Sequence, residues 1–142
     1  MSLFEGIKTP ETANAKAVKN YMEAFQTKDA AIFRKELADD IVFDGLLFKI
    51  DGIEAFVEQA KGFAELVESM KIEAITECAD ADHYLVIFWK KCKGAPEADS
   101  VCACDYFTLK DGKIQRINNV FDVDKMPQIK SFRNRQISYE FC

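Results

Sequence analysis

The sequence predicts an α+β domain in which helices come first and an antiparallel sheet follows. Three patterns indicate this class. Apolar residues recur at helical spacing in the first half of the chain, the spacing shifts toward two after Met70, and Lys110-Asp111-Gly112 is a strong hairpin signal between two alternating runs. Helices grouped before strands are typical of α+β architecture, whereas a regular alternation of strands and helices would indicate a parallel sheet.

Three helices are expected in the first half. The first opens at Thr9-Pro10-Glu11, where Thr9 can cap the helix and proline suits its first turn. A second, short helix begins at Asp29. The third follows Asp51, which forms a capping-box pattern with Glu54, and its apolar residues keep helical spacing as far as position 67.

Five strands are expected: a brief one at 41–44 and four later ones at 71–78, 83–92, 100–109 and 113–122. Turn residues separate the later four, so we expect them to form an antiparallel meander. No internal repeat and no low-complexity stretch interrupts the pattern. Residues 1–127 are therefore interpreted as one domain and residues 128–142 as a C-terminal extension.

The composition of the chain excludes several classes of binding partner. The chain has 142 residues and a net charge of −5, which argues against nucleic acid as a partner. No apolar run approaches the ~20 residues that a membrane span needs. The start of the chain is acidic where a secretory signal would be basic, and five cysteines, an odd number, indicate reduced thiols. We expect a cytoplasmic protein that binds neither membranes nor nucleic acid.

Carboxylate and phenol chemistry is what the remaining residues offer. The single histidine, His83, lies beside an aspartate at a strand start and is interpreted as an exposed turn residue, so no histidine-rich metal site is expected. The six glycines form no phosphate-binding or dinucleotide motif, and no cofactor is expected. The candidates are Tyr21 on an apolar helix face, Asp44 at the end of a strand and Asp105 within one.

Asp105 is the most informative of the three. Strand alternation places it on one face with four apolar residues, Val101, Ala103, Phe107 and Leu109. A carboxylate on a buried face must be paired or become neutral through a raised pKa, and a neutral acid can donate a hydrogen bond to an oxyanion. The alternative is an aspartate paired with lysine or arginine, or turned to solvent.

The chain resembles the SnoaL-like and ketosteroid-isomerase-like members of the nuclear transport factor superfamily. The similar stretches are YMEAF at 21–25, KD at 28–29, LADDIVFDG at 37–45, DGIEA at 51–55 and DYFTLKDGKI at 105–114. The resemblance covers roughly residues 12–124 and implies a strongly curved antiparallel sheet wrapped around helices, in the shape of a cone with a pocket. This fold hosts many activities, so the resemblance is specific for fold rather than for function.

The resemblance also implies roles for the candidates. Tyr21 and a protonated Asp105 match an oxyanion hole, and Asp44 lies in the strand that carries the family's base. An ungapped match puts Gly45 at the base position, so Asp44 can act as the base only if a bulge restores its direction. The ligand pocket that we expect from this fold is lined by Phe25, Phe56, Phe63, Phe107, Ile117, Asn119 and Phe121.

Two functions from different classes fit these observations. One is an enzyme that removes a proton next to the carbonyl of a small apolar substrate, as an isomerase or a cyclase would. The other is a non-catalytic module that binds a ligand or forms a dimer. In either case the outer sheet face, with Cys102, Cys104, Tyr106 and Thr108, is a candidate homodimer surface.

The twelve phenylalanines allow a solid core or a hollow one, and their positions favour the hollow one.

Overall fold

The computed structural model describes residues 2–46, 48–96 and 100–121. Its elements in chain order are α1 (Ala13–Thr27), α2 (Ala30–Glu36), β1 (Leu37–Asp44), β2 (Lys49–Asp51), α3 (Ile53–Leu66), β3 (Val67–Glu77), β4 (His83–Cys92), β5 (Val101–Lys110) and β6 (Lys113–Phe121). The predicted α+β order is confirmed, with β2 as an additional strand. The predicted domain boundary at 127 and the extension at 128–142 lie outside the described residues.

The first two helices begin at side-chain caps. The cap of α1 is Thr12 rather than the predicted Thr9, because the Thr12 hydroxyl accepts a hydrogen bond from the Ala15 amide at 3.0 Å. The second helix begins as predicted after Asp29, whose carboxylate accepts from the Ala31 amide at 3.1 Å. Each side chain satisfies an amide that the first turn of a helix leaves without a partner.

The start of α3 differs from the predicted capping box. Its N-cap is Gly52, with φ 91° and ψ 152°, and no side chain of the described residues caps the helix. Glu54 instead accepts two hydrogen bonds, at 2.6 and 2.9 Å, from the guanidinium of Arg34 in α2. The chain therefore enters α3 through a backbone conformation that glycine adopts readily and other residues do not.

The six strands of the described residues form one sheet in the order β2-β1-β6-β5-β4-β3. Strands β3 to β6 form the predicted antiparallel meander. Strand β1 adds to the edge of β6 in parallel orientation, and β2 pairs antiparallel with β1. Register shifts interrupt the pairing of β3 with β4, of β5 with β6 and of β1 with β6, and such bulges bend a sheet.

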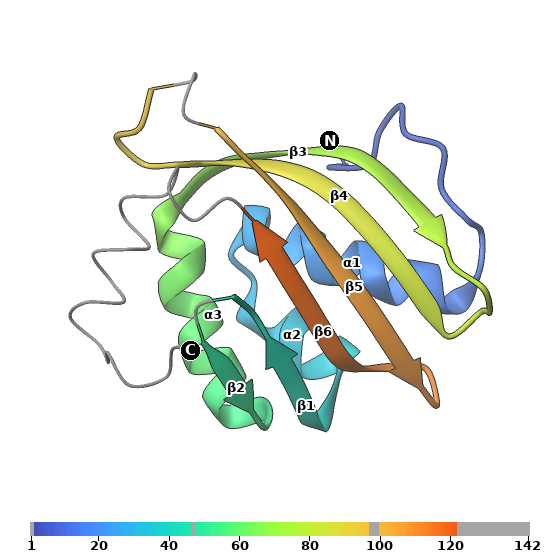
Figure 1. Cartoon of the computed structure of the whole chain (residues 1–142). Helices are drawn as coiled ribbons and strands as arrows, with labels where there is room; N and C mark the ends of the chain where they lie inside the picture. The colour runs from blue at the N-terminus through green and yellow to red at the C-terminus, as the bar shows by residue number, and fades with distance from the viewer. Residues whose placement is uncertain (1, 47, 97–99, 122–142) are drawn as a thin grey trace.

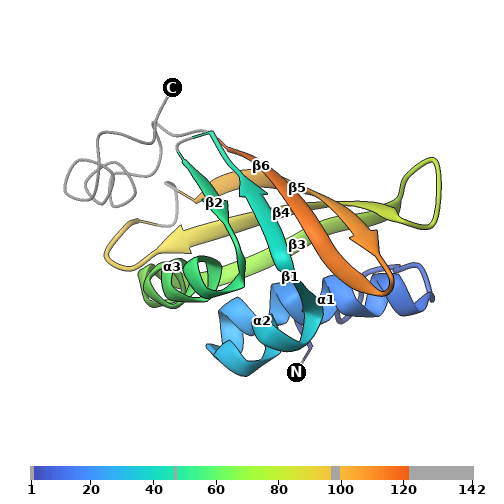
Figure 2. The same cartoon turned by 90° about the horizontal axis from the view of Figure 1, so that it is seen from below.

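The curved sheet wraps around the helices. Figures 1 and 2 show α1, α2 and α3 on the concave side, with the long β3 and β4 arching past α1. A contiguous apolar core fills the space between the buried face of α1 and the inward side chains of the sheet. None of the helices in the described ranges is both long and apolar enough to cross a membrane.

Gly52 and Gly62 make a matched pair for testing the entry into α3. A methyl group added at either glycine would meet no atom within 4 Å, but only Gly52 has a positive φ. We expect Gly52→Ala to lower the free energy of unfolding by ~1–3 kcal/mol through backbone strain. In contrast, Gly62→Ala, inside the helix, should raise it by ~0.5–1 kcal/mol. Urea unfolding of both variants measures this, and equal effects of the same sign would contradict the assigned backbone conformation.

Candidate functional site

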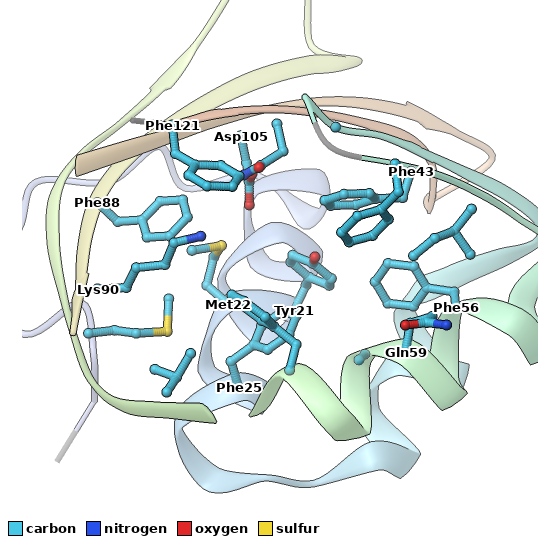
Figure 3. Close-up of a pocket in the computed structure, with 18 of the residues that line it drawn as sticks. Tyr21, Met22, Phe25, Phe43, Phe56, Gln59, Phe88, Lys90, Asp105 and Phe121 are labelled. Carbon is cyan, nitrogen blue, oxygen red and sulfur yellow. The ribbon is translucent and has the colours of Figure 1, made fainter. Parts of the chain in front are cut away.

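A cavity lies between the concave side of the sheet and helices α1 and α3 (Figure 3). Its volume is about 80 Å³, well above the roughly 10–15 Å³ that one water molecule requires. Its wall is mostly aromatic and aliphatic, and Leu46, which is 45% exposed, lies where the wall meets the surface. The lining residues are Tyr21, Met22, Phe25, Phe43, Gly45, Leu46, Phe48, Ile50, Phe56, Gln59, Ala60, Phe63, Val67, Met70, Phe88, Lys90, Asp105, Asn119 and Phe121.

Tyr21 presents a hydroxyl to this cavity. Its ring is 1% exposed and is fixed by edge-to-face contacts with Phe25, Phe33 and Phe107, whose centroids lie 5.2, 5.7 and 5.4 Å away. Figure 3 shows the oxygen directed into the cavity, and none of the described residues forms a hydrogen bond with it. Burial, assisted by the charge of Asp105, raises the pKa of Tyr21 well above its usual 10.0, so the hydroxyl is a neutral donor.

Asp105 reaches the cavity from the sheet. Burial alternates along the whole of β5, and the carboxylate is on the buried face, as the sequence predicts. Asn119, directly opposite on β6, donates a hydrogen bond to it at 2.5 Å. Burial raises the pKa of Asp105 from 3.8 to about 6, and the Asn119 hydrogen bond and the charge of Lys90 oppose the rise.

Lys90 is a functional candidate that the sequence patterns did not predict. The residue is 4% exposed, and its ammonium lies 4.5 Å from the ring centroid of Phe121, 4.8 Å from that of Phe63 and 5.7 Å from that of Phe88. Burial lowers the pKa of Lys90 from 10.5 to about 8, and the charges of Asp105 and Cys92 oppose the shift. No described residue accepts a hydrogen bond from the amine, which points into the cavity in Figure 3.

A signal for Lys90 was present in the sequence but was ambiguous. Tyr84, Val86 and Phe88 alternate with it on the inner face of β4. The outer positions carry Leu85, Ile87 and Trp89, so both faces of the strand look apolar and the alternation does not identify the inner one. Because Lys90 and Lys91 follow one another, the sequence does not show which of the two is buried.

The structure does not bring Asp44 to the other two candidates. Phe43 and Gly45 line the cavity, and the residue between them faces the other way. The Asp44 carboxylate accepts a hydrogen bond from Arg116 at 2.6 Å, and both side chains are about two-fifths exposed, at 39% and 41%. A Cβ at Gly45 would lie 3.0 Å from Phe43 Cε1, so the position that faces the cavity has no room for a side chain without a shift.

The expected pocket residues divide into two groups. Phe25, Phe56, Phe63, Asn119 and Phe121 line the cavity, whereas Phe107 and Ile117 do not. The prediction that Phe107 and Ile117 line the pocket is therefore wrong: both face inward, but they are fully buried and pack in the solid part of the core, where Phe107 contacts the ring of Tyr21. The aromatic residues therefore fill one part of the interior and line a cavity in another.

The remaining candidate groups lie away from the cavity or do not cluster. His83 contacts Asp80 at 2.7 Å and stacks on Tyr106 at 5.7 Å on the outer face. Within the described part of the chain, no three histidine, cysteine or acidic side chains gather in a way that could hold a metal ion. The cysteines at 78, 92, 102 and 104 are free thiols, and Cys142 lies outside the described residues.

The curved sheet, the three helices against its concave side and the cavity between them define the class of cone-shaped α+β folds related to nuclear transport factors. The chain belongs to the SnoaL-like domain family, which it matches over residues 18–117. No curated protein matches it significantly.

Solved structures agree with this fold. A steroid delta-isomerase from Pseudomonas aeruginosa has a TM-score of 0.74 and 13% identity, covering 92% of this chain and 96% of that chain. An LEH-like epoxide hydrolase from M. tuberculosis has a TM-score of 0.67 and 25% identity, covering 84% and 90%. A de novo designed protein with a curved β-sheet has a TM-score of 0.74 and 14% identity, covering 90% and 99%. Proteins with similar backbones thus have different functions, and one of these proteins is a design.

The pH dependence of stability tests the burial of Lys90. Its pKa in the folded protein, about 8, is below the ordinary 10.5. Between these values the unfolded chain binds more protons than the folded one, so this residue makes stability rise with pH. We expect the free energy of unfolding of the wild type, relative to Lys90→Met, to increase by up to about 3 kcal/mol from pH 8 to 10.5.

Urea unfolding at several pH values measures this difference. Lys91→Met removes an amine from the opposite face of the same strand, where it pairs with Glu68 at 2.6 Å, and is the matched control. If the difference in the free energy of unfolding between the wild type and Lys90→Met does not change over this pH range, the amine is solvated in the folded protein.

Proposed function

We propose that the chain binds a small, largely apolar aldehyde or ketone in the cavity and catalyses proton transfer at the carbon next to the carbonyl. The observation that carries this proposal is the convergence of three buried polar groups, those of Tyr21, Lys90 and Asp105, on an otherwise apolar space. Buried polar groups are normally hydrogen-bonded within the protein or to a ligand or water. The Tyr21 hydroxyl and the Lys90 amine have no such partner among the described residues.

The charge states of the three groups suggest their roles. Between pH values of about 6 and about 8, the pKa values of Asp105 and Lys90 make the first a carboxylate and the second an ammonium. A pair of groups that the environment keeps ionised and protonated, respectively, near neutral pH is suited to act as base and acid. Asp105 is then the base, while the Tyr21 hydroxyl and the positive charge of Lys90 stabilise the enolate oxygen.

These roles differ from the ones that the family resemblance implies. In the resemblance, Asp105 stays protonated as a hydrogen-bond donor and Asp44 moves the proton. Here a lysine shares the cavity with Asp105, and Asp44 pairs with Arg116 outside it. A carboxylate within the cavity can reach a bound substrate, whereas one on the opposite side of a strand cannot.

Non-catalytic binding of the same apolar carbonyl compound is the second candidate function. The observation that favours it is Gly45, which faces the cavity at the base position of the family and contributes no side chain. A binding protein would hold the ligand through Tyr21 and Lys90 without moving a proton. Saturable binding without proton exchange would distinguish this function from catalysis.

The assembly and the location of the chain stay predictions. The outer sheet face exposes Trp89, Tyr106 and Val120 at 37%, 37% and 50%. Exposed large apolar side chains on one sheet face support the expected homodimer surface. The free thiols at 78, 92, 102 and 104 are consistent with the expected cytoplasmic location.

Exchange of α-protons for deuterium tests catalysis without knowledge of the natural substrate. We expect the wild type to accelerate this exchange in cyclohexanone, acetophenone or a cyclic enone dissolved in D₂O, as followed by proton NMR. Asp105→Asn should lower the rate by ~10²–10⁴-fold, because it removes the base. Tyr21→Phe should lower it by ~10²–10³-fold, because it removes an oxyanion donor.

Asp44→Asn is the matched control, since it removes a carboxylate outside the cavity, and its rate should equal that of the wild type. The rate should be highest between pH about 6 and about 8, the range over which Asp105 is ionised and Lys90 is charged. Equal rates for wild type and Asp105→Asn would contradict the proposal. A large loss in Asp44→Asn alone would restore that residue as the base.

A further inference from the structure

Lys90 has surroundings that a structural role does not require. Its four-carbon stem fills space between aromatic rings, and a methionine could fill the same space without burying a charge. Lys90 is 4% exposed as a residue, and its amine lies within 5 Å of the ring centroids of Phe63 and Phe121, but the amine has no hydrogen-bond acceptor among the described residues. Contacts of this kind stabilise a cation by ~0.5–2 kcal/mol, which does not offset the cost of burying it.

The second observation is the acid that shares the cavity. Asp105 is 4% exposed, and its carboxylate acts electrostatically on Lys90, although the two groups form no ion pair within 4.0 Å in the described structure. Figure 3 shows both side chains directed into the same space from different strands. An amine and an acid separated by an open cavity leave room for a reacting group between them.

We infer that Lys90 forms an imine with the carbonyl carbon of an aldehyde or ketone bound in this cavity. This inference rests on the carbonyl binding of the proposed function. It adds that the substrate becomes covalently bound to Lys90, so that the imine nitrogen rather than the carbonyl oxygen accepts the electrons when the proton is removed. It specifies the substrate class as well, since aldehydes and unhindered ketones form imines with amines, whereas esters and amides do not.

The neutral amine that this reaction needs is accessible through proton transfer to Asp105. The pKa values of about 8 and about 6 lie close together, so transfer of a proton from the ammonium to the carboxylate is only mildly unfavourable. Between groups with the ordinary values of 10.5 and 3.8, the same transfer would be far more unfavourable. Burial of both groups therefore makes the nucleophilic form available near neutral pH.

The step balances without any other reactant. The nitrogen lone pair of Lys90 forms a bond to the carbonyl carbon, and the electron pair of the carbonyl π bond moves to oxygen. A proton passes from nitrogen to that oxygen, and this gives a carbinolamine. Asp105 in its acid form donates a proton to the hydroxyl, the C–O bond breaks and water leaves. The remaining nitrogen lone pair closes the C=N bond and leaves a protonated imine.

The cavity suits this product. The protonated imine carries its positive charge among the rings of Phe63, Phe88 and Phe121, where the ammonium lies in the free protein. Donation of the proton leaves Asp105 as a carboxylate beside the cation. That carboxylate can take the proton from the carbon next to the imine; the electron pair of the broken C–H bond forms a C=C bond, and the π pair of the C=N bond moves to nitrogen, which gives a neutral enamine. Asp105 thus serves first as acid and then as base.

Reductive trapping tests the imine. The full-length protein is incubated at pH 7 with benzaldehyde, which has no α-proton, and sodium cyanoborohydride, and the product is examined by intact mass and peptide mapping. We expect one benzyl group on Lys90, added on the order of 100-fold faster than on the surface lysines, because a larger fraction of this amine is neutral. Peptide mapping also separates Lys90 from the α-amine of the chain.

Lys90→Met should lose the fast modification, and Lys91→Met should keep it. Prior occupation of the cavity by acetophenone should slow the addition of the benzyl group to Lys90 in the wild type, a readout that does not depend on the folding of a variant. Slow, uniform labelling of all lysines, or an unlabelled Lys90, would overturn the inference.

The experiment separates this inference from the proposed function. Proton exchange in the wild type without trapping at Lys90 would overturn the imine and leave a non-covalent mechanism. Trapping at Lys90 without proton exchange would support the imine and overturn the proposed proton transfer.

Discussion

Two opposite charges are buried on the inner face of the sheet without contacting each other, and the properties of the site depend on this constraint. Strand alternation places Lys90 and Asp105 on the buried faces of β4 and β5. The pairing of these strands sets Asp105 opposite Val86 and Lys90 opposite Val101, so the two side chains start from well-separated points. Because both are almost fully buried, each shifts toward its neutral form, and the cavity between them becomes a place where a proton can be exchanged.

Such a pair weakens the fold while it prepares the site. The free energy needed to bury a charge that lacks a close partner exceeds the stabilisation that the surrounding aromatic rings provide. The rest of the domain offsets that cost with a contiguous apolar core and with the ring contacts around Tyr21. Polar groups are therefore concentrated in one cavity while Phe107 and Ile117 keep the neighbouring interior solid.

The sequence predicted the fold well, since strong periodicity and turn residues determine it. The meander, the second helix and the inward position of Asp105 follow from alternation and turn signals, and the fold-wide resemblance agrees with them. The short strand β2 and the glycine entry to α3 escaped prediction, because three residues carry no periodicity and a positive φ leaves no mark except the glycine itself.

The site was harder to predict than the fold. A single-residue register decides whether Asp44 or Gly45 faces the cavity, and only the strand pairing of β1 fixes it. Lys90 stayed hidden because apolar residues occupy both faces of β4. Family resemblance did not help with this residue, since fold relatives share a backbone and not a reaction.

Direct titration of Lys90 is the closest test of the buried amine, unpaired within the described structure, on which the site depends. The protein is labelled with carbon-13 at the ε-carbon of lysine, and the Lys90 resonance is assigned by its absence in Lys90→Met. We expect the Lys90 resonance to titrate near pH 8, well below the ordinary 10.5 of a lysine. A Lys90 resonance that titrates near the ordinary 10.5 would contradict this expectation, because such an amine would be solvated rather than buried in the cavity that it shares with Asp105.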